Sequence, residues 1–144
     1  MNPSCAWVGR AAGIAVVLAM ACQEKLPNAP AEVTTGVTIY EHANFGGASA
    51  LVERDLEDLE DFRGPCQHTE STGNGTSTTV LNWGDCISSI RIAPGWQATV
   101  YRDDHFKGQS LETTTDVANL QLVAGSCDHD GLNDCISSIR VRQR

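Results

Sequence analysis

Two identical segments of the chain carry residue types that could bind a cation. Residues 85–91 and 134–140 both read Asp-Cys-Ile-Ser-Ser-Ile-Arg. Each copy supplies a carboxylate, two hydroxyls and backbone carbonyls, which are the oxygen donors that a hard cation takes. The same side chains could instead close a turn through hydrogen bonds to the backbone, which is the structural alternative.

A second pair of matched segments precedes the two copies. Each segment contains a Tyr, a Phe and a Gly at the same spacing, namely Tyr40, Phe45 and Gly47 in the first and Tyr101, Phe106 and Gly108 in the second. The chain therefore holds one kind of structural unit twice, beginning with the aromatic segment and ending with the Asp-Cys-Ile-Ser-Ser segment.

Short strands separated by polar turns are the pattern that positions these segments. The expected strands are residues 37–40, 50–52, 88–92, 98–101, 110–112 and 137–141, which are rich in β-branched residues or alternate polar with apolar residues. Residues 55–59 and 116–120 could each form one helical turn, and residues 69–79, rich in turn formers, are expected to be a solvated surface loop. Many short strands in two similar halves predict an all-β, antiparallel two-sheet sandwich of Greek keys.

The first part of the chain has the composition of an export signal. Arg10 precedes an apolar run, and small residues stand just before Cys22, which predicts a signal peptide over residues 1–21. The run is too short for a good membrane span. We expect lipid attachment at Cys22, giving an outer-membrane or cell-surface lipoprotein, with plain cleavage and a periplasmic or secreted protein as the alternative.

A tether and one folded domain are expected to follow. Residues 22–35 contain two prolines and show no strand or helix period, as in a linker. Residues 36–144 are long enough for one domain with an ordinary core, in which the first motif spans about 36–94 and the second about 95–144.

The composition excludes some classes of function. The formal net charge is −8, which argues against nucleic acid as a partner, because phosphate binding needs clustered Lys and Arg. Nucleophile elbows, phosphate loops and zinc-protease helix motifs do not occur in the sequence. We therefore expect a protein that is not an enzyme.

The matched segments together carry a family resemblance. Residues 40–47 and 101–108 resemble the first-hairpin signature of βγ-crystallin Greek keys, and Asn-Asp-Cys-Ile-Ser-Ser at residues 133–138 resembles that family's calcium-binding stretch, N/D-N/D-x-x-S/T-S. The resemblance covers residues 37–142. It implies a βγ-crystallin-like antiparallel β-sandwich of two Greek key motifs that binds calcium, gains stability from it and has no catalytic activity.

The resemblance also implies which atoms bind calcium. The implied ligands are the carboxylates of Asp85 and Asp134, the hydroxyls of Ser88 and Ser137, and the carbonyls of Cys86, Cys135, Glu41 and Arg102, with Asn133 beginning the second stretch. Each ion would be shared between the two units, and which Asp completes which site stays open.

Two departures from the family pattern predict that the sites, up to two in number, are unequal. Gly84 stands where the pattern has Asn or Asp, so one oxygen-bearing side chain is missing from the first stretch. Arg102 stands where Glu41 stands in the first unit, and a guanidinium raises the electrostatic cost of a nearby divalent cation.

The cysteines suit an exported protein. Of 6 cysteines, Cys5 falls in the signal and Cys22 at its end, so four remain to form disulfides, with three possible pairings. The matched places in the two units favour Cys66 with Cys86 and Cys127 with Cys135. The competing interpretation is zinc, because His68 and His129 each follow two residues after a cysteine.

Two other functions remain open on a crystallin-like fold. One is a secreted or cell-surface inhibitor of hydrolases, in which residues 69–79 would be the inhibitory element. The other is a carbohydrate-binding module, in which Trp83 and Trp96 could stack on sugar.

Overall fold

The fold is built from short antiparallel strands. The structure, a computed structural model, describes residues 32–125, 127 and 131–144. Its elements in chain order are β1 (Val37–His42), the 3-10 turn η1 (Ala43–Phe45), β2 (Gly46–Val52), β3 (Arg63–Thr72), β4 (Thr76–Asn82), β5 (Ser89–Ile92), β6 (Trp96–Asp103), β7 (Lys107–Thr113), the 3-10 turn η2 (Leu120–Leu122) and β8 (Ser138–Gln143). All six predicted strands are confirmed, with ends that differ by a few residues.

The predictions for the start of the chain fall largely outside this range. The expected signal peptide (residues 1–21), Cys22 and residues 23–31 of the expected tether lie outside the described residues. Among the residues that are described, no helix has the length and apolar character needed to cross a membrane.

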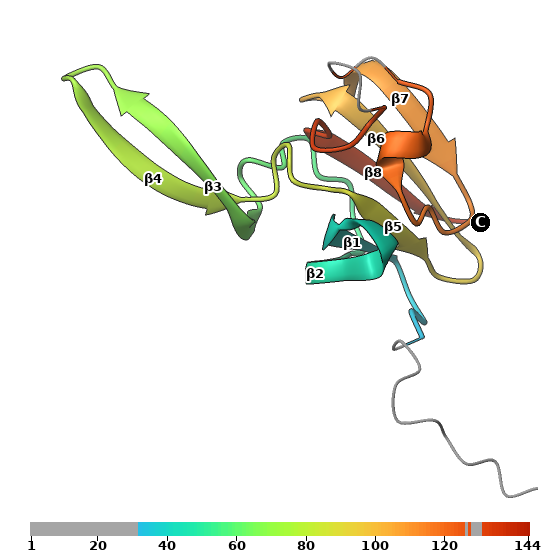
Figure 1. Cartoon of the computed structure of the whole chain (residues 1–144). Coiled ribbons are helices and arrows are strands. Elements are labelled where there is room, and N and C mark those ends of the chain that lie inside the picture. The colour runs from blue at the N-terminus through green and yellow to red at the C-terminus, as the bar shows by residue number, and fades with distance from the viewer. Residues whose placement is uncertain (1–31, 126, 128–130) are drawn as a thin grey trace, which may run out of the picture. The chain divides into compact units, whose positions relative to one another are not determined.

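The described residues form two three-stranded antiparallel sheets, in the orders β2-β1-β5 and β7-β6-β8, and one two-stranded sheet of β3 and β4 (Figure 1). The central strands of the two three-stranded sheets have matching registers. In β1, Val37 pairs with Val52 on one side and Ile92 on the other. In β6, Ala98 pairs with Thr113 and Val141 in the same way.

Each half of the chain also adds a short extended segment to the sheet of the other half. Leu56 bridges Ile139 of β8, and Val117 bridges Ile90 of β5. The Leu56 N–H donates to the Ile139 carbonyl and the Ile139 N–H donates back, both at 2.9 Å. These exchanged segments give the chain its Greek key connections.

The helical turns predicted at residues 55–59 and 116–120 are therefore wrong, apart from Leu120, where η2 begins. The competing interaction is the sheet itself. A helical turn would have left the Leu56 and Val117 backbone groups without their cross-strand partners. These hydrogen bonds stabilise the extended form.

Alternate residues along the central strands β1 and β6 are buried, and these residues help to make the core. Val37 and Ile39 of β1 are fully buried, whereas Thr38 and Tyr40, which alternate with them, are partly exposed, as expected for a strand with one face in a core. One cluster joins apolar residues from both sheets, including Val37, Ile39, Val52, Ile90, Ala98, Val100, Ile139 and Val141. The all-β, two-motif fold predicted from the sequence is confirmed.

The segment predicted as a surface loop is instead the outer part of a hairpin. Among the described residues, strands β3 and β4 pair only with one another, through partners such as Thr69 with Thr79 and Ser71 with Ser77 (Figure 1). The run of β-branched Thr residues favours extended backbone. Gly75, with φ of +75°, allows the turn between the strands. Solvent exposure of this segment was predicted correctly, but its regular structure was missed.

Each of the two matched heptapeptides, residues 85–91 and 134–140, is joined by a disulfide to an earlier cysteine. Cys66 at the base of the hairpin is joined to Cys86, as predicted, and Cys127 is joined to Cys135. Since these sulfur atoms are bonded to one another, they are not free thiolates for zinc. Within the described part of the chain, no cluster of three or more His, Cys, Asp or Glu residues is arranged to hold a metal ion by those side chains alone.

Candidate functional site

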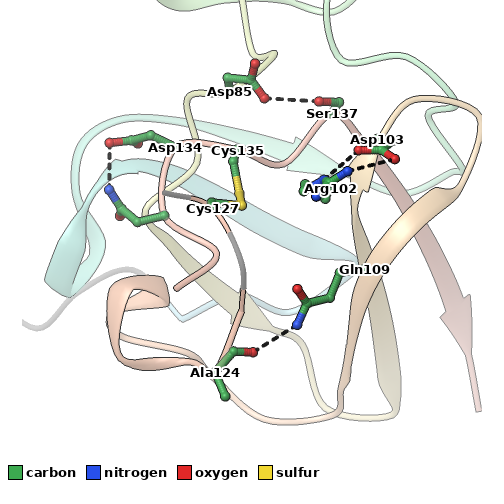
Figure 2. Close-up of a disulfide and its surroundings, with 10 residues drawn as sticks. Asp85, Arg102, Asp103, Gln109, Ala124, Cys127, Asp134, Cys135 and Ser137 are labelled. Atoms are coloured by element: carbon green, nitrogen blue, oxygen red, sulfur yellow. Dashed lines mark hydrogen bonds and ion pairs between the residues drawn. A yellow bond between two sulfur atoms is a disulfide. The ribbon is translucent and has the colours of Figure 1, made fainter. Parts of the chain in front are cut away.

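The aspartate of each heptapeptide reaches the serine of the other copy. The Ser88 Oγ lies 3.1 Å from Asp134 Oδ1, and the Ser137 Oγ lies 3.0 Å from Asp85 Oδ1; Figure 2 shows Asp85 and Ser137 turned toward one another. Both aspartates have left-handed backbone, with φ of 46° for Asp85 and 50° for Asp134. Asp134 thus lies beside Ser88 and Asp85 beside Ser137, an arrangement that the sequence did not indicate.

The Ser88–Asp134 contact belongs to the first of two candidate sites, the Ser88 cluster, which is made of Glu41, Ser88, Asn133 and Asp134. Besides facing Asp134, the Ser88 Oγ donates to the Glu41 carbonyl oxygen at 2.7 Å. The other carboxylate oxygen of Asp134 accepts from the Asn133 side-chain amide at 2.6 Å. A hydroxyl, a carbonyl and a carboxylate oxygen from both halves of the chain therefore converge on one point.

The neighbouring serines have a different role. Ser89 Oγ donates to the His42 carbonyl at 2.6 Å and accepts from the Phe45 N–H at 3.0 Å. In the second half, Ser138 Oγ donates to the Asp103 carbonyl at 2.7 Å and accepts from the Phe106 N–H at 3.0 Å. These hydroxyls fix the turns after β1 and β6, a role that the sequence did not reveal.

The second candidate site is the Ser137 pocket, a cavity of about 380 Å³. It is lined by Asp58, Glu60, Asp85, Arg102, Asp103, Asp104, Cys135 and Ser137. Five of these eight residues are acidic and one is basic, so the pocket has a strongly negative lining that favours a cation.

Arg102 is held by its neighbour at the edge of this pocket. Its Nε donates to Asp103 Oδ1 at 2.7 Å and its Nη2 to Asp103 Oδ2 at 3.3 Å (Figure 2). The hydrogen bond from Arg102 holds the pKa of the Asp103 carboxyl below its ordinary value. Arg102 therefore has a local carboxylate partner, which reduces the repulsion that its charge exerts on a cation.

The predicted ligand residues thus separate into two groups. Glu41, Ser88, Asn133 and Asp134 meet in the Ser88 cluster, and Asp85, Arg102, Cys135 and Ser137 meet in the Ser137 pocket. Cys86 is buried in the core. The sequence did not single out Asp58, Glu60, Asp103 or Asp104 as pocket residues. The acids at residues 57–61 were the available signal for the first two, but nothing in them indicated a fold back onto Ser137.

Known proteins agree with this architecture. No family model matches the chain. Spherulin-3A of Physarum polycephalum, a βγ-crystallin-type protein, is 31% identical over 107 residues, which cover 73% of this chain and 80% of that protein.

Solved structures give the same result. A structure from work on the evolution of the eye lens βγ-crystallin domain fold matches with a TM-score of 0.56 and 25% identity, over 81% of this chain and 95% of the other. A βγ-crystallin domain from Flavobacterium johnsoniae matches with a TM-score of 0.50 and 31% identity, over 75% and 94% respectively. The chain belongs to the βγ-crystallin family.

Proposed function

We propose that this protein binds calcium at the Ser88 cluster and the Ser137 pocket, that calcium stabilises its fold, and that it has no catalytic activity. The observation that carries the proposal is the geometry of Ser88. Its Oγ faces two acceptors, the Glu41 carbonyl at 2.7 Å and the Asp134 carboxylate at 3.1 Å, but a hydroxyl has only one proton to donate. Three electron-rich oxygens around one proton favour replacement of that hydrogen bond by a cation.

The donor set fits calcium among the metals. The converging atoms are carboxylate, carbonyl and hydroxyl oxygens, which are hard ligands, and the nearby sulfur atoms are in disulfides. Ser89 provides the contrast. Its hydroxyl has one hydrogen-bond donor and one acceptor as partners, so both its hydrogen-bonding roles are satisfied without an ion.

Each proposed site takes oxygens from both halves of the chain. A bound ion would therefore hold the first half to the second, and a ligand bound only by the native state stabilises that state.

Export of the protein is part of the proposal. The Cys66–Cys86 bridge supports it, because disulfides persist in oxidising compartments.

The first prediction is that calcium raises the thermal stability of the oxidised full chain. Calcium at a hundredfold excess over Kd contributes about 2.7 kcal/mol per site. We therefore expect the melting temperature, measured by circular dichroism, to rise from chelator to calcium. Calorimetric titration should show two binding events with unequal affinities.

Magnesium at the same concentration is the control for general screening of the acidic surface. It should raise the melting temperature less than calcium, because it is smaller and demands a stricter octahedral geometry. Identical melting curves in chelator and calcium, together with no heat of binding, would show that the heptapeptides only close turns.

A further inference from the structure

Gly84 packs closely against the side chain of Glu60, and its backbone conformation does not require glycine. The residue is buried and is not among the glycines with positive φ. A Cβ atom built on it would lie 2.8 Å from Glu60 Cγ and 3.4 Å from Asn82 Oδ1. Glu60 therefore occupies the space where a side chain of residue 84 would begin.

The backbone around Glu60 is fixed beside Ser137. The N–H of the fully buried Leu59 donates to the Ser137 carbonyl at 2.9 Å, and the Trp83 N–H donates to the Leu59 carbonyl at 3.1 Å. The Glu60 N–H donates to Asp58 Oδ1 at 2.8 Å. These bonds anchor the backbone on which Glu60 stands, and Glu60 lines the Ser137 pocket with Asp85.

We propose that the Glu60 carboxylate is a cation ligand in the Ser137 pocket, supplying the side-chain oxygen that Gly84 lacks. The inference rests on the proposed calcium binding and names a ligand from outside the heptapeptides. It changes the meaning of the departure at Gly84. The oxygen missing from the motif would then come from a segment that is distant in sequence.

The test compares Glu60→Gln with Asp61→Asn by calorimetric calcium titration of the oxidised full chain. Both residues are exposed and both variants remove one negative charge, but Asp61 does not line the Ser137 pocket. Because calcium affinity depends on the number of charged ligands, Glu60→Gln should weaken one of the two binding steps about tenfold or more. Asp61→Asn should change either step less than about twofold, as expected for an exposed charge screened by salt.

A second pair of variants assigns the weakened step. Ser137→Ala disrupts the same pocket. Adding Glu60→Gln to Ser137→Ala should therefore reduce the calcium affinity by a smaller factor than Glu60→Gln does in the parent. The two effects should add when Glu60→Gln is combined with Ser88→Ala. Circular dichroism without calcium checks that every variant folds.

The possible results separate this inference from the function on which it rests. A parent that binds no calcium overturns both. The parent could instead bind calcium while Glu60→Gln and Asp61→Asn have the same calcium affinity, either both weakened or both unchanged. That result overturns the role of Glu60 and leaves calcium binding in place.

Discussion

Ser88 and Ser89 are neighbours in the sequence, yet their hydroxyl groups meet different partners. Ser88 faces a carbonyl and a carboxylate, whereas Ser89 sits between an acceptor and a donor. In the second half, Ser137 faces the Asp85 carboxylate, whereas Ser138 again sits between an acceptor and a donor. The sequence predicted the first serine of each pair as a ligand because of its place in a motif. The turn-closing role of the second depends on the approach of the hairpin backbone, which sequence spacing alone does not give.

The crossed pairs lead to a prediction at the scale of residues. Asp85→Asn and Ser137→Ala should weaken one calcium-binding step, whereas Asp134→Asn and Ser88→Ala should weaken the other. In double-mutant cycles measured by calorimetry, Asp85 should couple to Ser137 by about 0.5 kcal/mol or more, as residues in direct contact do.

The matched control is the uncrossed combination. Asp85→Asn with Ser88→Ala pairs two residues of the same heptapeptide that face different sites, so the effects should add within about 0.5 kcal/mol. Coupling within one heptapeptide and none across the two would contradict the crossed arrangement.

The β3–β4 hairpin shows what sequence patterns could and could not predict at the scale of elements. Alternation of polar and apolar residues predicted β5 and β8, and short runs of β-branched residues predicted β1 and β6; each of these strands has one face in the core. The hairpin has no apolar face along residues 69–79, so the pattern indicated only exposure. Leu56 and Val117 were misassigned for a related reason, since their extended form depends on partners in the other half of the chain.

A prediction at the scale of elements concerns removal of the hairpin tip. Replacing residues 70–78 by Asn-Gly leaves Thr69 and Thr79 on either side of a two-residue turn. The removed residues with a described exposure are all exposed, and the Cys66–Cys86 bridge still closes the base. The melting temperature should change by less than about 3 °C, which is a small fraction of the effect of a core mutation.

Leu59→Ala is the comparison for this deletion. Leu59 is fully buried, so its truncation should cost about 2 to 5 kcal/mol. If deleting the tip lowers the melting temperature as much as Leu59→Ala does, the hairpin contributes to the core in a way that its exposure does not indicate. If calcium affinity falls as well, the hairpin also supports a binding site.

At the scale of the whole molecule, the two halves of the chain are interdependent. The β8 strand receives Leu56 from the first half, and β5 receives Val117 from the second. The core cluster draws apolar side chains from both. The sequence could predict this mutual dependence only through the family resemblance, because the strand pattern of each half is consistent with a separate unit.

We therefore predict that neither half folds alone. Residues 32–94 and 95–144, prepared separately, should lack cooperative thermal unfolding by circular dichroism and should show no calcium heat in calorimetry. Each would expose the apolar face that the other covers and lose one bridge segment of its sheet. A cooperative transition in either fragment would mean that the exchanged segments are dispensable.

The crossed hydroxyl–carboxylate pairs also bear on the order in which the chain assembles. They join residues 46 and 52 positions apart, and such distant contacts require long loops to close before they contribute any energy. Contacts that form after the folding barrier slow the escape from the native state and leave the rate of reaching it almost unchanged. The Asp-Cys-Ile-Ser-Ser segments are thus placed to determine how long the folded molecule lasts, while the speed of folding depends on the local hairpins.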